Sequence, residues 1–414
     1  MRGLRIGLLL GLRQIQRANK WTTALIIFVM MLTFLNLVAV SGILVGLIEG
    51  AVRGVKEESL GDMVISPLPE EDRILETERI MRELQTFPEI AAYTVRYKSG
   101  ATLEANYKER RDLRGERDIA TVNVTGIDPA LEDSAMHLKQ NILEGTYLEP
   151  DDQGYILVGK YYIDRYAQQF GDVFDSLGGI YPGDTVRLTA GDISKEFIVK
   201  GIVDSKVDEV SLNTYIPERE FRRLFNRGEH NADQIAIRIE HDKDPTAVRD
   251  GLLGIGMGEL AKVETFEEAQ PKFITDIKNT FDVLGTFIGS IGIIVASITI
   301  FIIIFINALS RRRQIGILKA VGIQERVIEI AYVAQAAFYA FIGSTLGLLL
   351  TFFVLVPYFD AHPINFPFSD GVLVVEVSGA LIRFAILFVV TLAAGFIPAW
   401  LIARQNTLNA ILGR

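Results

Sequence analysis

The chain has 414 residues, of which 49% are hydrophobic and 22% charged, and its formal net charge is −9. It contains no cysteine, so disulfide bridges are excluded and any domain outside the membrane must be held by its own core. The apolar residues gather in long uncharged stretches, and these indicate an integral membrane protein.

Residues 1–20 predict a cytoplasmic amphipathic helix. One side of a helical wheel carries Leu4, Leu8, Leu12 and Ile15, and the opposite side carries Arg2, Arg13, Arg17 and Lys20. This division is typical of a helix that lies on an anionic membrane surface. A cleaved signal peptide is the competing interpretation, because residues 39–41 resemble a cleavage site. The apolar run is, however, nearly twice as long as a signal h-region of about 7 to 15 residues.

Four uncharged apolar stretches are long enough to cross a bilayer, which takes about 20 residues. They are residues 21–48, 283–310, 330–359 and 384–403. Because no ionisable residue falls inside these limits, the sequence argues against an ion- or proton-coupled carrier.

The charges beside the spans predict which side each loop occupies. Residues 1–20, 311–329 and 404–414 have an excess of basic side chains, whereas the other two connecting segments, 49–282 and 360–383, are acidic overall. Short basic loops stay in the cytoplasm. We therefore expect both termini and the loop 311–329 to be cytoplasmic, and the large domain 49–282 and the short loop 360–383 to be extracytoplasmic.

The large domain is predicted to be α+β. Two β-α-β units, at about 62–97 and 234–265, flank a strand-rich insert at about 100–231. In the second unit Ile235, Ile237 and Ile239 alternate as in a half-buried strand. We expect the two units to pair as one compact subdomain from which the insert projects.

Small residues recur at four-residue intervals in three of the spans. The pairs are Gly42 and Gly46, Gly285 and Gly289, and Gly343 and Gly347. Such spacing lets helix backbones approach closely in lipid. Packing within the chain and an interface with a second copy are both open interpretations.

The motifs of common enzymes are missing from the sequence. The four histidines, at 137, 230, 241 and 362, are isolated, so their spacing predicts no zinc site and no histidine-based triad. The chain also lacks the P-loop pattern, and we expect it to bind no ATP, metal or other cofactor itself.

The most specific pattern is the run RRRQIGILKAVG from Arg311 to Gly322, directly after the second span. A second pattern, GFIPA, covers residues 395–399, and the domain contains GDTV at 183–186 and VKGI at 199–202. These motifs resemble those of the FtsX-like permeases of ABC transporters, in particular the MacB type and the lipoprotein-releasing LolC- and LolE-like permeases. The resemblance covers essentially the whole length: one span, a large extracytoplasmic domain and three further spans. Gln335 departs from it, because family members often carry an acidic residue at the start of the third span.

The resemblance implies a non-catalytic permease subunit in a bacterial inner membrane. Such a type VII-like system couples ATP hydrolysis on a separate ATPase subunit, which holds the ATP and Mg, to export, lipoprotein release or mechanotransmission. It also implies a second permease copy or homologue and contact with membrane lipids. Candidate outer partners are a periplasmic adaptor, a lipoprotein carrier or a cell-wall enzyme, and no nucleic-acid partner is expected. The alternative is an ATP-independent membrane scaffold or sensor with an extracytoplasmic ligand-binding domain.

The loop 311–329 is the predicted docking site for the ATPase. It is short and basic, and Gly316 and Gly322 bracket an apolar turn. The arginines can be explained without docking, because basic residues anchor helix ends on the cytoplasmic side. A short, rigid loop between two spans nevertheless favours docking. The predicted docking residues are Arg311, Arg312, Arg313, Ile315, Gly316, Leu318, Lys319, Gly322, Glu325 and Arg326.

Overall fold

The computed structural model describes residues 2–108, 118–167, 175–270, 272–362, 364–366, 369–371 and 373–404. The chain divides into two compact units. The helical unit comprises Met1–Glu49, Asp276–Phe366 and Asp370–Arg414, and the outer unit comprises Gly50–Thr275 with Pro367–Ser369. Each unit is described by itself.

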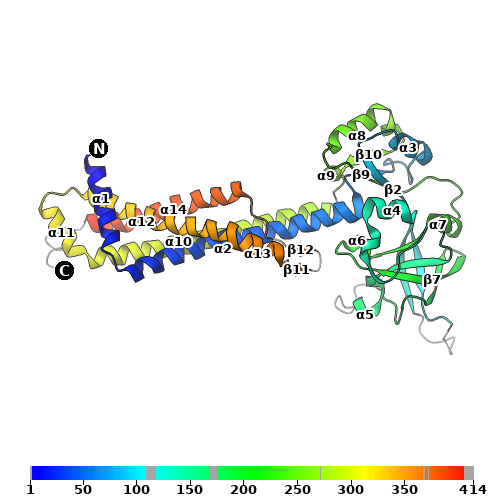
Figure 1. Cartoon of the computed structure of the whole chain (residues 1–414), viewed down its shortest axis with the longest axis horizontal. Helices are drawn as coiled ribbons and strands as arrows, with labels where there is room; N and C mark the ends of the chain where they lie inside the picture. Colours follow the sequence, from blue (N-terminus) through cyan, green and yellow to red (C-terminus); the bar gives the residue numbers. More distant parts are fainter. Residues whose placement is uncertain are drawn as a thin grey trace. The chain divides into compact units, whose positions relative to one another are not determined.

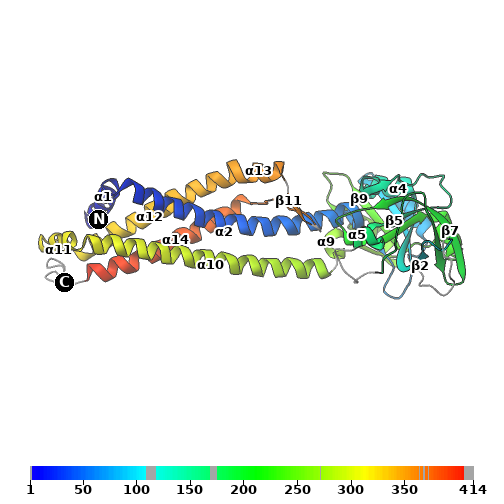
Figure 2. The ribbon, with the colours of Figure 1, turned by 90° about the horizontal axis from the view of Figure 1, so that it is seen from below.

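The helical unit is built from long apolar helices that lie side by side (Figures 1 and 2). Within the described part of the chain, four helical segments are long and apolar enough to cross a membrane, which confirms the predicted class of membrane protein. They correspond to α2, α10, the α12–α13 segment and α14. The elements are α1 (Arg2–Gln16), α2 (Lys20–Val55), α10 (Lys272–Ser310), α11 (Arg312–Ala320), α12 (Glu325–Leu350), a π-helix (Thr351–Leu355), α13 (Val356–Ala361), α14 (Val377–Ala403) and a hairpin of β11 (Ile364–Phe366) and β12 (Ser369–Gly371).

The long helices extend beyond the apolar stretches that predicted them. Helix α2 continues past Ile48 to Val55, and α10 begins at Lys272 rather than at Val283. Helix α14 begins at Val377, so Arg383 lies inside a helix and not in the predicted loop 360–383. The prediction followed hydropathy, but polar residues such as Glu and Lys also form helices well, so a helix need not end where its apolar part does.

Glycines set the closest contacts in the helical unit. A Cβ atom at Gly343 would lie 2.5 Å from Met30 Cβ, and one at Gly347 would lie 2.7 Å from Phe34 Cδ1. These glycines therefore let α12 approach α2. Around the contact lies a core cluster to which α2, α10, α12 and α14 all contribute, including Phe34, Ile304, Tyr339 and Leu387.

In the outer unit, the two β-α-β segments form one antiparallel sheet. The first segment is β1 (Met63–Ser66), α3 (Thr77–Leu84) and β2 (Ile90–Glu104), and the second is β9 (Gln234–Ile239), α8 (Pro245–Gly254) and β10 (Lys262–Thr265). The strand order is β10-β1-β9-β2, so each segment is a split β-α-β unit with a strand of the other between its own. This confirms the predicted pairing of the two units.

The insert forms a closed ring of strands. Its strands are β3 (Ile119–Ile127), β4 (Ile142–Gly145), β5 (Tyr155–Gly159), β6 (Thr185–Ala190), β7 (Ile193–Val203) and β8 (Asn213–Pro217). Pairing runs β2-β3-β8-β5-β7-β6 and returns to β2, with β4 added beside β7. The short helices of the outer unit are α4 (Pro129–Met136), α5 (Asp164–Ala167), α6 (Asp208–Ser211), α7 (Glu218–Leu224) and α9 (Phe266–Ala269), with 3-10 turns at Leu138–Asn141, Lys160–Tyr162 and Met257–Glu259.

The ring and the first sheet share one core, which differs from the expectation of a projecting insert. Strand β2 belongs to both, pairing with β9 over its first part and with β3 over its second. One hydrophobic cluster includes Ile65 and Ile237 from the sheet together with Val124 and Phe197 from the ring. Burial continues across β2, so removing the ring would expose part of the sheet's own core.

Candidate functional site

The predicted docking loop forms a short helix and a tight turn. Helix α11 ends in a Schellman motif, in which the Ile323 N–H donates to the Leu318 carbonyl and the Gly322 N–H donates to the Lys319 carbonyl, both at 3.0 Å. Gly322 has φ +92°, a left-handed conformation that side chains with a Cβ disfavour. Nothing described lies within 4 Å of a Cβ built there. Gly322 is thus required by the backbone of the turn rather than by packing.

One face of α11 is packed against the helical unit. Ile315 is 3% exposed, Gly316 is buried and Leu318 is half-buried. The Lys319 Nζ donates to Glu325 Oε1 and to the carbonyl of Ala403, each at 2.8 Å. Ala403 is the last residue of α14, where a cation complements the helix dipole and an unpaired carbonyl. These predicted docking residues hold α11 in place in this structure and offer little surface to a partner.

The opposite face of α11 is exposed and forms a stripe at four-residue intervals. Arg313, Ile317 and Val321, called here the α11 stripe, all face away from the unit, with Ile317 50% and Val321 78% exposed. Gly322, Glu325 and Arg326 are also exposed, and Arg311 is half-buried. The side chain of Arg312 lies outside the described part of the structure. Sequence reasoning missed Ile317 and Val321, although their spacing from Arg313 could have identified them.

The glycine pairs lie mostly against other helices of the same chain. Gly343 and Gly347 meet α2, as described above, and a Cβ at Gly42 would lie 2.9 Å from the Val374 carbonyl oxygen. Gly46 is buried within α2. The contacts of Gly285 and Gly289 are looser, since their Cβ positions are 3.5 Å from Leu44 Cδ1 and 3.2 Å from Leu37 Cδ1. Packing within the chain therefore accounts for the tight pair on α12 and leaves more room beside α10.

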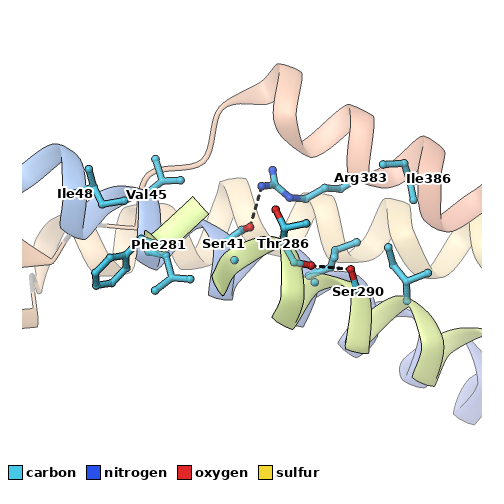
Figure 3. Close-up of a pocket in the computed structure, with 13 residues that line it drawn as sticks. Ser41, Val45, Ile48, Phe281, Thr286, Ser290, Arg383 and Ile386 are labelled. Carbon is cyan, nitrogen blue, oxygen red and sulfur yellow. Dashed lines mark hydrogen bonds between the residues drawn. The ribbon is translucent and has the colours of Figure 1, made fainter. Parts of the chain in front are cut away.

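That room is part of a cleft between α2, α10 and α14, with a volume of about 450 Å³ (Figure 3). The Arg383 side chain reaches from α14 toward α2, where its Nη2 donates to Ser41 Oγ at 2.9 Å. Thr286 and Ser290 of α10 also line the cleft. A cation and hydroxyl groups thus face a space whose other walls are apolar.

A buried charge network fixes the start of the outer unit. Arg96 and Glu132 are 5% and 1% exposed, and the Arg96 Nε donates to both Glu132 carboxylate oxygens at 3.1 Å. Arg96 also donates through Nη1 to the carbonyl of Ser59, in the π-helix Lys56–Leu60. Burial alone would lower the pKa of Arg96, but the Glu132 carboxylate raises it above its ordinary value.

Neighbouring residues of the same π-helix bind both parts of the outer unit. Glu58 Oε2 accepts from Asn141 Nδ2 at 2.7 Å, on the ring side, and Ser59 Oγ donates to Glu209 Oε2 at 2.9 Å. The Glu57 carbonyl accepts from Arg238 Nη2 at 2.8 Å, on strand β9 of the sheet. The segment that follows α2 is therefore held by the sheet and the ring together.

The four long apolar helical segments of the described chain and the sheet-based outer unit define a multi-pass membrane protein with a large α+β domain. Residues 286–407 match the family model described as FtsX-like permease C-terminal. The macrolide export ATP-binding/permease protein MacB of Campylobacter jejuni (strain 81-176) is 23% identical over 255 residues, which cover 58% of this chain and 38% of MacB. An uncharacterized ABC transporter permease of Methanocaldococcus jannaschii, MJ1507, is 24% identical over 281 residues, 66% of each chain.

These sequence matches confirm the resemblance to FtsX-like permeases of the MacB type. The chain corresponds to less than half of the length of the Campylobacter MacB protein. The crystal structure of the periplasmic region of MacB from Actinobacillus actinomycetemcomitans aligns with 53% of this chain and 91% of its own, with a TM-score of 0.36 and 17% identity. The extracellular domain of the Gram-positive transporter YknZ aligns with 49% of this chain and 97% of its own, with a TM-score of 0.33 and 14% identity.

Proposed function

We propose that this chain is the permease subunit of an ABC transporter and that the α11 stripe binds a separate ATPase subunit. The observation that carries the proposal is an exposed pair of apolar side chains, Ile317 and Val321, beside Arg313 on a short helix. Exposed apolar residues flanked by charge are typical of protein interfaces. The ATP and Mg would belong to the ATPase, and this chain would supply no catalytic group.

The attachment of α11 suits a coupling element. Its buried face, the Lys319 contacts with Glu325 and Ala403, and the Gly322 turn connect the exposed stripe to α12 and α14. A push on the stripe would therefore move these helices rather than bend a loose loop. The basic residues around the stripe support a cytoplasmic position, and the acidic excess of residues 49–282 supports an extracytoplasmic outer unit.

The network around the π-helix Lys56–Leu60 supports transmission into the outer unit. Helix α2 runs directly into this segment. Between them, Ser59, Glu58 and Glu57 form hydrogen bonds to both the sheet and the ring. We propose that movement of α2 reorients the outer unit as one body, in a complex with a second permease copy or homologue. Export, lipoprotein release and activation of an outer partner are all served by this motion.

The experiment is co-purification of the full chain with a co-expressed cognate ABC ATPase. Ile317→Asp should weaken the complex by about 2 kcal/mol, or about thirtyfold in Kd, because a charge would be buried in an apolar contact. Ile255→Asp is the matched control, since Ile255 is 47% exposed but lies in the outer unit. Equal ATPase recovery with both variants would contradict the docking assignment, and no ATPase binding by the unmodified chain would favour the scaffold or sensor alternative.

A further inference from the structure

Arg383 lies in the second turn of α14, and the described part of the chain gives it no acidic partner. Its Nη2 donates to Ser41 Oγ at 2.9 Å, and no ion pair involves it among the described residues. Among the residues whose side chains are described, those that line the cleft include no carboxylate. A cation within a membrane helix is costly unless it is paired or reaches the interface. Here the side chain turns into the cleft toward α2 (Figure 3), so its charge is available to a ligand.

The rest of the cleft is suited to a hydrocarbon chain. Leu37, Leu44 and Ile48 of α2 form one wall, and Ile293 of α10 and Ile386 of α14 lie across from them. Gly285 and Gly289 leave space on the α10 side of the cleft, because neither glycine has a Cβ atom to fill it. A volume of about 450 Å³ falls within the range of known ligand pockets.

From this juxtaposition we propose that the cleft binds an anionic phospholipid, with the phosphate at Arg383 and an acyl chain along the apolar walls. Guanidinium groups bind phosphate through charge-assisted, two-pronged hydrogen bonds. Ser41 already accepts from Arg383 and could donate its own hydroxyl hydrogen to a phosphate oxygen. Arg383 is near the beginning of α14, and headgroups lie near the ends of membrane helices. This inference does not depend on ATPase docking.

The test is native mass spectrometry of the full chain released from membranes that contain equal amounts of phosphatidylglycerol and phosphatidylcholine. The unmodified protein should retain phosphatidylglycerol at least about tenfold more than phosphatidylcholine, the ratio expected from one charge-assisted contact. Arg383→Gln should reduce that ratio to near one, while Arg383→Lys should keep part of it. Arg53→Gln is the control, because Arg53 is likewise an arginine near a helix end but does not line the cleft.

A second variant tests the apolar walls without touching the charge. Gly289→Leu would fill the space beside Leu37 and should reduce retention of the lipid severalfold, with Arg383 intact. Equal retention of the two lipids, or unchanged retention in Arg383→Gln, would overturn the proposal. Displacement of the lipid by inorganic phosphate alone would also overturn it, because the apolar walls would then contribute nothing. Efficient disulfide formation between Ser290→Cys copies that carry no lipid would show that a second copy of the chain covers the cleft instead.

Discussion

At the scale of single residues, the docking loop has two kinds of side chain. Some pack against the helical unit and fix α11 in place, and others are exposed on its outer face. The sequence identified the loop through its basic run and glycines, but it assigned Ile315, Gly316, Leu318 and Lys319 to the docking surface. In the structure these residues face inward. Helical spacing shows which residues of α11 share a face, but it does not show which face points inward. Packing against α12 and α14 decides that.

Gly322 provides the clearest test of a residue that acts through the backbone. Gly322→Val should destabilise the turn by about 1–2 kcal/mol or more, because a β-branched residue does not tolerate φ +92°. Gly322→Asn should cost less, since asparagine accepts the left-handed conformation. Thermal melting of the purified protein and ATPase recovery should follow the same order. Equal effects of the two substitutions would indicate that Gly322 acts through direct contact with a partner.

The buried pair of Arg96 and Glu132 should be far more important for stability than an exposed one. Glu132→Ala leaves the Arg96 charge buried and unpaired, which should reduce the free energy of unfolding of the outer unit by about 3–5 kcal/mol. Glu196→Ala removes an exposed partner of Lys108 and should change stability very little. Chemical denaturation of the two variants makes the comparison, and similar midpoints would contradict the role of the buried pair.

At the scale of elements, the number and order of the four apolar spans were predictable from the sequence. The ends of these helices and their contacts were not. Hydropathy located four spans, whereas the extensions of α2 and α10 and the start of α14 depend on backbone hydrogen bonding that apolar content does not report. Helix α1 was predicted to lie on the membrane surface. In the structure it packs on α12 through Gly7 and Gly11, while Leu4, Leu8 and Leu12 remain exposed.

The α1 contact can be tested with a single enlarged side chain. A Cβ at Gly7 would lie 2.6 Å from Ile330 Cγ2, so Gly7→Leu should push α1 away from α12. The side-chain amides of Gln14 and Gln335 form a hydrogen bond across the same contact, which makes the pair suitable for a disulfide reporter. Gln14→Cys with Gln335→Cys should cross-link readily alone and poorly with Gly7→Leu. Leu9→Ala, at a position 60% exposed, is the control and should leave cross-linking unchanged.

At the scale of the whole molecule, the outer unit should behave as one cooperative body. The sequence predicted two β-α-β units and an insert, and both are present, but their shared strand and core could not be inferred from local patterns. Because β2 and one hydrophobic cluster run through both parts, residues 50–275 should unfold in a single transition. Deleting residues 100–231 should prevent folding. Two separate transitions, or a folded deletion product, would mean that the sheet and ring are independent.

Cross-linking from defined positions shows directly whether the α11 stripe binds an ATPase. The chain contains no cysteine, so each introduced thiol is unique. In the co-expressed complex, Val321→Cys and Arg313→Cys should form adducts with the ATPase through a short thiol-to-amine reagent, whereas Leu318→Cys on the inward face and Ser134→Cys in the outer unit should form none. Adducts from Ser134→Cys, or none from the stripe in a complex that remains intact, would show that the ATPase does not bind the α11 stripe.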